Sequence, residues 1–504
     1  MIPFEDWNEP DPAELLVLAS DRDWEELRNR YAGFNDVPLA RCLEVARANG
    51  ASTVVVETRY VDLDYRSEYS AFYSRTFRSR PDSAHRLHFF KAPLIESQLW
   101  ALPDDHGYLG YVVIRPSELG QVGRSVLAPP PGLADAVRTK VRDEVTFFGA
   151  KLQVEGAPFT QQDTQLGRCA HAAAWMCHYT AYRRGDVARQ AMANFSLSAD
   201  PSLGSGRSLP SEGLTLSQLI DLFRVFDLPA SFYDVQQLPP SVLAPFAPED
   251  PQPPQPVDSE PLHPGLWDTR LFRICCRYLN SGTPVLVATF DHTFVLTGYQ
   301  RVTRPGERDW IQFIRHDDQE GPYRSVGDIF NDTSDDGYMY SPWEALVVPL
   351  PDKLWLPPEP AEGTGGVYLQ RFAEDAVSSI PEARQLLDLI AAGELALHTY
   401  ARPANSFKAE LDRGIDPALV REYRLARFSR FVWVVEAIDR RRRRAQEPCV
   451  VGEAIFDATS SETDPLCLAM HVPGIAWVAR TFGPPRFPIR CAPDAYATGG
   501  VGAP

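Results

Sequence analysis

The sequence has few cysteines, few lysines and no long apolar run. Eight of its 504 residues are cysteines, and Cys275 and Cys276 are adjacent. A secreted domain held together by disulfides carries cysteine at a much higher density, so we exclude a disulfide scaffold and expect reduced thiols in a cytoplasmic protein. Arginine is abundant whereas lysine occurs at only five positions, which together with the many alanines and prolines indicates a bacterial source.

Further absences narrow the function. No stretch reaches the roughly eighteen consecutive apolar residues of a membrane-spanning helix, so no membrane span is expected. The acidic first residues, MIPFEDWNEPDPAELL, lack the basic and apolar segments of a secretory signal. The 50 basic residues are outnumbered by 67 acidic ones, which gives a net charge of −17 that repels phosphate backbones and anionic lipid. We therefore expect no nucleic acid among the partners.

Length and composition predict a globular protein of several domains. Hydrophobic residues make up 44% and charged residues 23% of the chain, which excludes wholesale disorder. At roughly 100–200 residues per domain, the chain accommodates about three domains. We place an α/β domain at residues 1–130, a central domain at 131–350 and an α+β domain at 365–490. A proline-crowded segment at 236–265 is predicted to be an exposed insertion in the central domain.

Apolar patterning predicts the elements of each domain. In the first two domains it predicts helices at 12–50 and 133–148 and strands at 52–65 and 107–116. In the last domain it predicts helices at 383–401 and 417–428 and strands at 431–438 and 449–458. The five consecutive arginines at 440–444 are predicted to lie in a solvated loop or on an internal ion-pair surface.

The segment 158–185, PFTQQDTQLGRCAHAAAWMCHYTAYRRG, carries the first chemical signal. Cys169 follows a turn that contains Gly167, and the alanine-rich run after it favours a helix. A thiol at a helix N-terminus meets the positive end of the helix dipole and free N–H groups, which stabilise the thiolate and lower the pKa of the thiol. The alternative is a buried cysteine at the start of an ordinary core helix, which is the commoner case for an isolated cysteine.

Two later segments supply an imidazole and a carboxylate. TPVLVATFDHTFVLTGYQRV, residues 283–302, predicts two apolar strands with His292 in the polar break between them. WIQFIRHDDQEGPY, residues 310–323, predicts a strand that ends at Asp317 and Asp318. A thiol at a helix start, followed by an imidazole and a carboxylate on later strands, has the order of a nucleophile, its base and the group that orients the base.

These segments resemble the papain-like cysteine peptidases, particularly their bacterial C39-like branch. The resemblance covers about residues 158–325 and rests on glutamine before Cys169 at a central helix, on His292 in HTFVLTGY and on Asp317 before a glycine. It implies a papain-like α+β fold for the central domain, with a helix and an antiparallel sheet. It also implies that Cys169 is the nucleophile, His292 the general base and acid, and Asp317 the orienting residue.

The oxyanion donor is less well fixed by this resemblance. The family position of the donor glutamine holds Asp163 in this chain, and the resemblance therefore implies the preceding Gln162. Gln161 and Gln165 stay open as alternatives. Each of the three amides can donate a hydrogen bond to a developing oxyanion.

The orienting carboxylate has two candidates. Successive residues of a regular strand point to opposite faces, so at most one of Asp317 and Asp318 is expected to reach His292. The spacing to Gly321 favours Asp317. The other aspartate is predicted to be a solvated turn residue.

A metal site is the competing interpretation of the cysteine segment, which contains Cys169, His171, Cys177 and His178. Zinc requires ligand atoms that converge about 2.0–2.3 Å from one point. Residues 169 and 177 of a single helix are about 12 Å apart along its axis, so they cannot close such a site. We expect no metal, and the other three residues are predicted to pack or to lie on the surface.

The sequence therefore predicts a cysteine-dependent hydrolase that cleaves an amide bond of a peptide or protein substrate through an acyl-thioester, without a cofactor. Transglutaminases, deamidases and arylamine acyltransferases share the Cys–His–Asp order, so transfer to another acceptor stays open. The rival interpretation is an inactive papain-like scaffold that binds a protein partner, which a large side chain such as Trp175 in the substrate position would favour. Segment 236–265 is a candidate flexible lid or autoinhibitory loop, and the oligomeric state is not predicted.

Overall fold

The computed structural model describes residue 7 and residues 11–165, 167–203, 213–238, 269–302, 310–326, 343–411, 414–461, 465–479 and 489–499. They belong to two compact units. The first comprises Met1–Gln236, Thr283–Gln300 and Gln312–Pro351, and the second comprises Gln237–Gly282, Arg301–Ile311 and Asp352–Pro504. The division into three domains stays a prediction, since the first unit holds both sides of the boundary placed at residue 130. Nearly all of the predicted insertion and lid at 236–265 lies outside the described residues.

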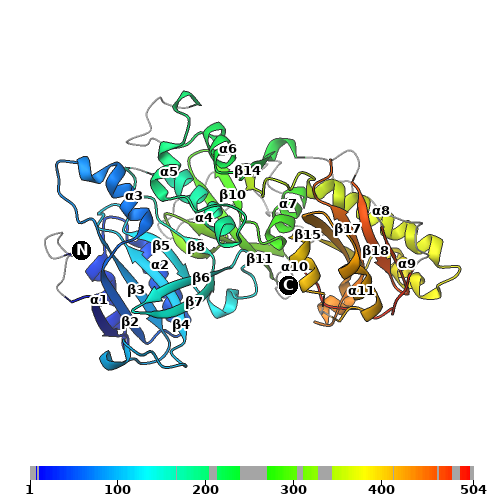
Figure 1. Cartoon of the computed structure of the whole chain (residues 1–504), viewed down its shortest axis with the longest axis horizontal. Helices are drawn as coiled ribbons and strands as arrows, with labels where there is room; N and C mark the ends of the chain where they lie inside the picture. Colours follow the sequence, from blue (N-terminus) through cyan, green and yellow to red (C-terminus); the bar gives the residue numbers. More distant parts are fainter. Residues whose placement is uncertain are drawn as a thin grey trace, which may run out of the picture. The chain divides into compact units, whose positions relative to one another are not determined.

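The first unit opens with a six-stranded sheet whose strand order is β1-β2-β3-β4-β5-β8. All five neighbouring pairs are antiparallel. The strands are β1 Ala13–Val17, β2 Thr53–Tyr60, β3 Ala84–Phe90, β4 Tyr108–Ile114, β5 Val122–Leu127 and β8 Pro158–Phe159. Three helices alternate with its first strands: α1 Asp21–Tyr31, α2 Val37–Ala48 and α3 Leu63–Ala71 (Figure 1).

This sheet corrects the α/β class predicted for residues 1–130. Strands and helices do alternate in this part of the chain, but alternation in sequence does not determine strand direction. Because its strands are antiparallel, the region is α+β. The strand predicted at 107–116 is confirmed as β4, and the strand predicted at 52–65 is confirmed as β2 as far as Tyr60, whereas Leu63 already begins α3.

Strand β1 also corrects the prediction of helix throughout residues 12–50. A five-residue apolar segment is too short for its periodicity to separate strand from helix. Ala13–Val17 is a strand because it pairs with β2 in antiparallel register. The remainder of the range contains two helices, and α1 begins at a capping box in which Ser20 and Asp23 accept each other's backbone N–H groups.

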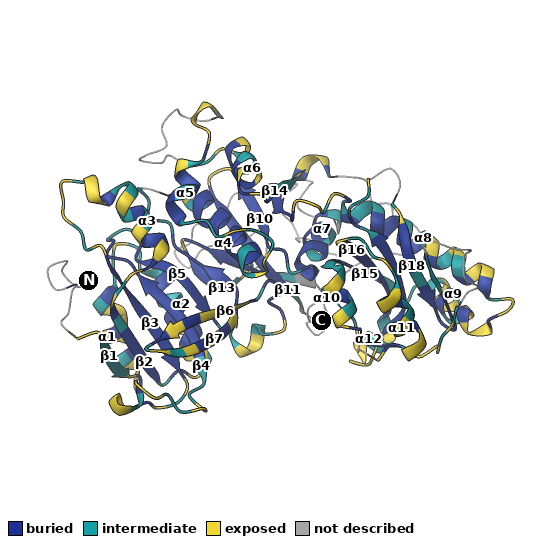
Figure 2. Cartoon of the chain, in the orientation of Figure 1, coloured by how far each residue is buried: buried dark blue, intermediate teal, exposed yellow. Residues whose placement is uncertain are grey.

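A hairpin replaces the helix predicted at 133–148. Its strands, β6 Val141–Phe147 and β7 Ala150–Gly156, pair with each other in antiparallel register. Buried and exposed side chains alternate along β6 (Figure 2). This period of two is the pattern of a strand with one buried face, and it outweighs the apolar content on which the helix prediction depended.

A second six-stranded sheet in the first unit has the order β13-β12-β11-β10-β14-β9. Its strands are β9 Ala230–Asp234, β10 Val285–Thr289, β11 Thr293–Val302, β12 Trp310–Asp317, β13 Gly321–Ser325 and β14 Trp343–Pro349. The two strands predicted in 283–302 and the strand predicted to end at Asp317 are therefore confirmed.

Helix α4, Cys169–Arg183, connects the two sheets of the first unit. It contacts β8 of the first sheet and β10 of the second, together with helices α5 Met192–Leu197 and α6 Leu216–Val225 (Figure 1). One continuous apolar cluster includes Leu87 from the first sheet, Trp175 from α4 and Leu286 from the second sheet. The helix that begins at Cys169 is thus held by the core on both sides.

The second unit contains a sheet with the order β15-β16-β17-β18-β19-β20, in which neighbouring strands are antiparallel. The strands are β15 Leu395–Pro403, β16 Phe431–Asp439, β17 Val450–Asp457, β18 Cys467–Val472, β19 Ile475–Val478 and β20 Ile489–Arg490. The helices are α7 Thr269–Asn280, α8 Pro358–Ala376, α9 Arg384–Ala391, α10 Ala404–Ala409, α11 Pro417–Leu425 and α12 Arg440–Arg444.

Two predictions for the second unit need correction. The helix expected over 383–401 stops at Ala391, because Gly393 adopts a φ of 66° and β15 follows. The arginines at 440–444 form the short helix α12 instead of a loop, since the Asp439 carboxylate caps the N–H groups of Arg441 and Arg442. The alternative of an ion-pair surface is confirmed, because Arg444 pairs with Glu394 at 3.0 Å.

The described chain as a whole belongs to the α+β class, with helices and antiparallel sheets. None of the described helices has the length and hydropathy needed to cross a bilayer.

Candidate active site

Cys169 is the first residue of α4, as the sequence predicts. Its side chain is partly exposed. By contrast, Cys42 and Cys177 are buried, and burial raises the pKa of each thiol. Among these three thiols, Cys169 alone combines a helix N-terminus with access to solvent.

His292 lies in the turn between β10 and β11. Thr289 fixes this turn, because its backbone N–H donates to His292 O at 2.9 Å and its Oγ1 accepts from His292 N at 3.1 Å. The imidazole is 5% exposed. Two rigid strands therefore hold the ring, as the sequence predicts for a polar break between them.

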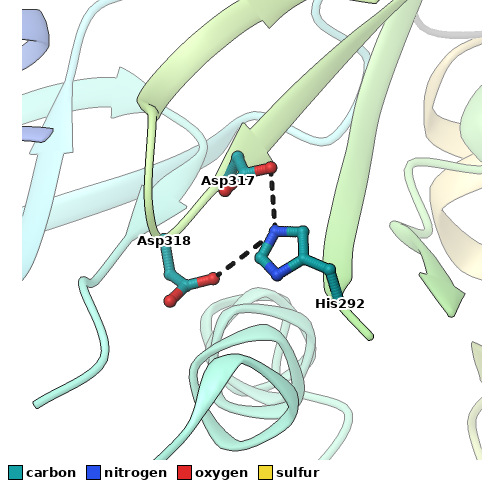
Figure 3. A group of neighbouring side chains, drawn as sticks. All are labelled: His292, Asp317 and Asp318. Carbon is teal, nitrogen blue, oxygen red and sulfur yellow. Dashed lines mark hydrogen bonds and ion pairs between the residues drawn. The ribbon is translucent and has the colours of Figure 1, made fainter. Parts of the chain in front are cut away.

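The His292 imidazole is paired with Asp317 at the end of β12. Nε2 of His292 lies 3.0 Å from Oδ2 of Asp317 (Figure 3). Burial disfavours the charged imidazole, but attraction to Asp317, this hydrogen bond and a hydrogen bond with the Cys169 side chain raise the pKa of His292 well above its usual value. Nδ1 is the ring nitrogen that faces away from Asp317 (Figure 3).

Asp317 is suited to remain ionised. Burial alone would raise its pKa, but the positive charge and hydrogen bond of His292 and the nearby Arg315 guanidinium lower the pKa of Asp317 below its usual range. Nε of Arg315 lies 3.7 Å from Oδ2 of Asp317. The backbone N–H of Gln319 also donates to Oδ1 of Asp317, at 2.9 Å. The carboxylate thus fixes the imidazole with the proton on Nε2.

Asp318 corrects the prediction that only one aspartate approaches the histidine. Its Oδ1 lies 3.9 Å from Nε2 of His292, and the residue is buried instead of solvated (Figure 3). The register of β12 shifts between Arg315 and Asp317, and the strand ends at Asp317, so the alternation of strand faces no longer applies. Burial and the charge of Asp317 raise the pKa of Asp318 to about 7, although His292 acts to lower it.

Cys169 and His292 line the same pocket, which has a volume of about 480 Å³. Gln162 and Gln319 also line it. Nε2 of Gln319 lies 3.3 Å from Nδ1 of His292. Cys169, His292, Gln162 and Gln319 therefore border one cavity. No feature of the sequence marked Gln319 as a member of this group.

Trp175 does not occupy this pocket. It is buried on α4, and its indole N–H donates to Oδ1 of Asp64 in α3 at 3.2 Å. Its ring stacks on Tyr179, with centroids 4.9 Å apart. Trp175 therefore does not block the pocket, which is the arrangement that would have favoured an inactive scaffold.

The three candidate glutamines differ in their surroundings. The Gln161 amide is engaged, since Nε2 donates to Asn35 O at 3.0 Å and Oε1 accepts from Val122 N at 3.1 Å. Gln162 lines the pocket, whereas Gln165 is not among the lining residues. This geometry favours Gln162 as the donor.

The helix residues of the rejected zinc site are packed in the core. His171, Cys177 and His178 are all buried. Nδ1 of His171 accepts the backbone N–H of Arg168 at 3.2 Å, and burial lowers the pKa of His171 to about 4. His171 thus serves as a neutral cap for the start of α4.

His292, Asp317 and Asp318 form the one group of the described residues whose donor atoms lie close enough to hold a metal, within 4.8 Å of one another. A cation here would displace the proton that Nε2 of His292 shares with Asp317, and it would face the Arg315 guanidinium 3.7 Å from that carboxylate. The raised pKa of His292 favours the proton over a metal at this nitrogen.

Comparison with known proteins places this chain in no family. No family model matches it, and no curated protein matches it. Among solved structures, the crystal structure of UfSP from C. elegans is similar at 14% identity, covering 39% of this chain and 33% of that chain with a TM-score of 0.22. The matched part spans about a third of the UfSP chain, and so low a score carries no argument. The comparisons give no support to the bacterial C39-like branch, and the interpretation of the site depends on its geometry.

Proposed function

We propose that this protein is a cysteine-dependent hydrolase that cleaves an amide bond in a peptide or protein, with a papain-like arrangement of its central domain. One observation carries the proposal: Cys169 and His292 line one pocket, while buried Asp317 holds the far side of the imidazole, with Oδ2 3.0 Å from Nε2 of His292. This arrangement supports the roles of Cys169 as nucleophile, His292 as base and Asp317 as the orienting group.

The first step is ionisation of the thiol. Nε2 of His292 is occupied by Asp317, so Nδ1 is the nitrogen that accepts the proton of Cys169. The raised pKa of His292 favours the imidazolium, and the N-terminus of α4 stabilises the thiolate. Asp317 stabilises the imidazolium without becoming protonated itself.

Catalysis then follows from these positions. The thiolate of Cys169 attacks the amide carbonyl, and the amide of Gln162 donates a hydrogen bond to the oxyanion that forms. His292 transfers its Nδ1 proton to the leaving amine, and the C–N bond breaks to give an acyl-thioester. Water, deprotonated by His292, attacks the thioester and releases a carboxylic acid and the free thiol.

The test is incubation of the protein with a peptide library and mass spectrometry of the products. New peptide termini would identify hydrolysis, whereas deamidated or crosslinked side chains would identify the related transfer reactions. Cys169→Ala is expected to abolish every product without loss of folding. Cys276→Ala, which removes another partly exposed thiol, is the matched control and is expected to retain activity. Products that persist in Cys169→Ala would refute the proposal.

A further inference from the structure

The loop that leads into α4 is held by residues far away in the sequence. We call it the pre-helix loop and define it as Gln161–Gln165 together with Gly167 and Arg168. Its contacts come from residues 31–130 of the first unit, for which the catalytic interpretation provides no role. Because the loop carries Gln162 and ends at the nucleophile, whatever holds it also determines the geometry of the site.

The first anchor is Arg115, which binds the backbone of the loop. Its Nη2 donates to Gln161 O at 2.7 Å, and its Nη1 lies 3.1 Å from Oε1 of Glu68. Both charged side chains are buried. The loop continues the first sheet, since Gln161 N donates to Val122 O at 2.9 Å. A fixed guanidinium and a strand therefore hold the residue just before Gln162.

The second anchor is Tyr73, whose hydroxyl donates to Oδ2 of Asp163. The other carboxylate oxygen of Asp163 accepts the backbone N–H groups of Gln165 at 3.0 Å and Gly167 at 3.1 Å. Both Tyr73 and Asp163 are buried. Asp163, which occupies the family position of the oxyanion glutamine, thus folds the loop around its own carboxylate, and Tyr73 orients that carboxylate.

The third anchor is the close approach of Gly120. A Cβ atom added at this glycine would lie 2.0 Å from Gln162 O and 2.9 Å from the Cα atom of Asp163. Only glycine allows the backbone of the loop to pack against this segment. The position of the Gln162 backbone is therefore set by contact with the first sheet's connecting segment.

We propose that the N-terminal region is a structural part of the active site, in which Tyr73, Arg115 and Gly120 are positioning residues for the pre-helix loop. They hold Gln162 at the oxyanion position and Cys169 at the start of α4. This inference rests on the proposed function, because it assigns these residues to the same reaction. It explains why residues 31–130 and the helix of the nucleophile share one compact unit.

Tyr73→Phe tests this role with little change in volume. Loss of the hydroxyl is expected to speed amide exchange at Gln165 and Gly167 about fivefold, the factor that corresponds to one hydrogen bond. Alkylation of Cys169 by iodoacetamide is expected to slow about tenfold, with its pH profile displaced upward, because the helix start no longer holds the thiolate. Tyr65→Phe is the control, since the Tyr65 hydroxyl donates to Pro81 O at 2.6 Å, and it should leave both readouts unchanged.

Gly120→Ala provides a second test that does not depend on a hydroxyl. The added methyl group displaces Gln162, and turnover is expected to fall about a hundredfold through kcat, with KM nearly unchanged. Gly132→Ala is the control, because a Cβ there meets no atom within 4 Å.

The outcomes separate this inference from the proposed function. Wild-type exchange and wild-type alkylation in Tyr73→Phe would overturn the positioning role while leaving Cys169 as the nucleophile. Slow, unselective alkylation of Cys169 in the wild-type protein would instead overturn the proposed function, and with it the catalytic meaning of the loop. Equal effects of Tyr73→Phe and Tyr65→Phe would reduce Tyr73 to a general stabilising residue and would also overturn the inference.

Discussion

Two of the buried imidazole–carboxylate pairs in the described part of the chain differ in their surroundings, and His292 of one pair lines the pocket described above. His292 and Asp317 are 3.0 Å apart in the first unit. In the second unit, Nδ1 of His398 lies 2.8 Å from Oε2 of Glu436, its direct partner across β15 and β16. The charge of Glu436 also acts to raise the pKa of the Cys449 thiol.

The difference between the two groups lies in their surroundings. Oε1 of Glu436 accepts the Tyr400 hydroxyl at 3.0 Å and Gly499 N at 2.8 Å, which satisfies the carboxylate within the core. Burial raises the pKa of the Cys449 thiol, so the neutral form is favoured. Cys169 instead begins a helix and borders a cavity. Under the proposed function, a thiol that borders a cavity and begins a helix distinguishes the first group from the second.

The largest contrast is expected from removal of the two histidines. His292→Ala should lower kcat/KM on the library peptides about a thousandfold, because no base remains for Cys169. His398→Ala should retain turnover and lower the free energy of unfolding by about 1–3 kcal/mol, since it leaves a buried hydrogen-bonding group unsatisfied. Steady-state kinetics and urea unfolding measure the two effects. Equal losses of kcat/KM in His292→Ala and His398→Ala would show that the two imidazole–carboxylate pairs do not differ in function.

The carboxylates provide the next contrast. Asp317→Asn should lower kcat about a hundredfold, because a neutral amide no longer stabilises the imidazolium of His292. Glu436→Gln should leave kcat unchanged and lower the melting temperature. Full activity in Asp317→Asn, measured on the same peptides, would show that Asp317 does not orient the base.

The pH dependence of stability should also differ between the wild-type protein and Asp317→Asn. The lowered pKa of Asp317 stabilises the fold above the unfolded pKa of about 3.9, and this contribution is lost as pH falls through the lower folded value. The raised pKa of His292 stabilises the fold below about pH 6.5, and this contribution is lost as pH rises through the higher folded value. The difference in melting temperature should therefore be largest between about pH 4 and 6.5. A constant difference from pH 4 to 9 would contradict the assigned shifts.

Asp318→Asn is expected to have the smallest effect. Asp318 lies 3.9 Å from the imidazole and titrates near pH 7, so its charge supports the imidazolium only at higher pH. The substitution should change kcat less than about tenfold and lower the upper pKa of the pH–rate profile. A loss as large as that of Asp317→Asn would make Asp318 the orienting residue.

Much of the candidate site follows from local sequence. The alanine run predicts the helix after Cys169, and two apolar strands flanking a polar break predict the position of His292. The approach of Asp318 could not be predicted, because it depends on a register shift in β12. Short segments were the other source of error. The strand state of β1 depends on pairing with the distant β2, whereas β6 carries a period of two in its own sequence and pairs with the adjacent β7.

The N-terminal contacts with the pre-helix loop were equally hidden. Tyr73 and Asp163 are 90 positions apart, and nothing in a tyrosine within an aromatic stretch indicates its partner. Sequence patterns report the face that a residue presents to the core. They do not report which distant loop that face supports.

The rate of alkylation at each cysteine tests the central claim most directly. Iodoacetamide labelling from pH 5 to 9, followed by peptide mass spectrometry, compares Cys169 with Cys449 and the six remaining thiols in one sample. If His292 holds the proton of Cys169, this thiol should react at least about tenfold faster than any other near pH 6, and His292→Ala should abolish the advantage. A Cys169 rate that matches the other partly exposed cysteines, or that is unchanged in His292→Ala, would contradict the account.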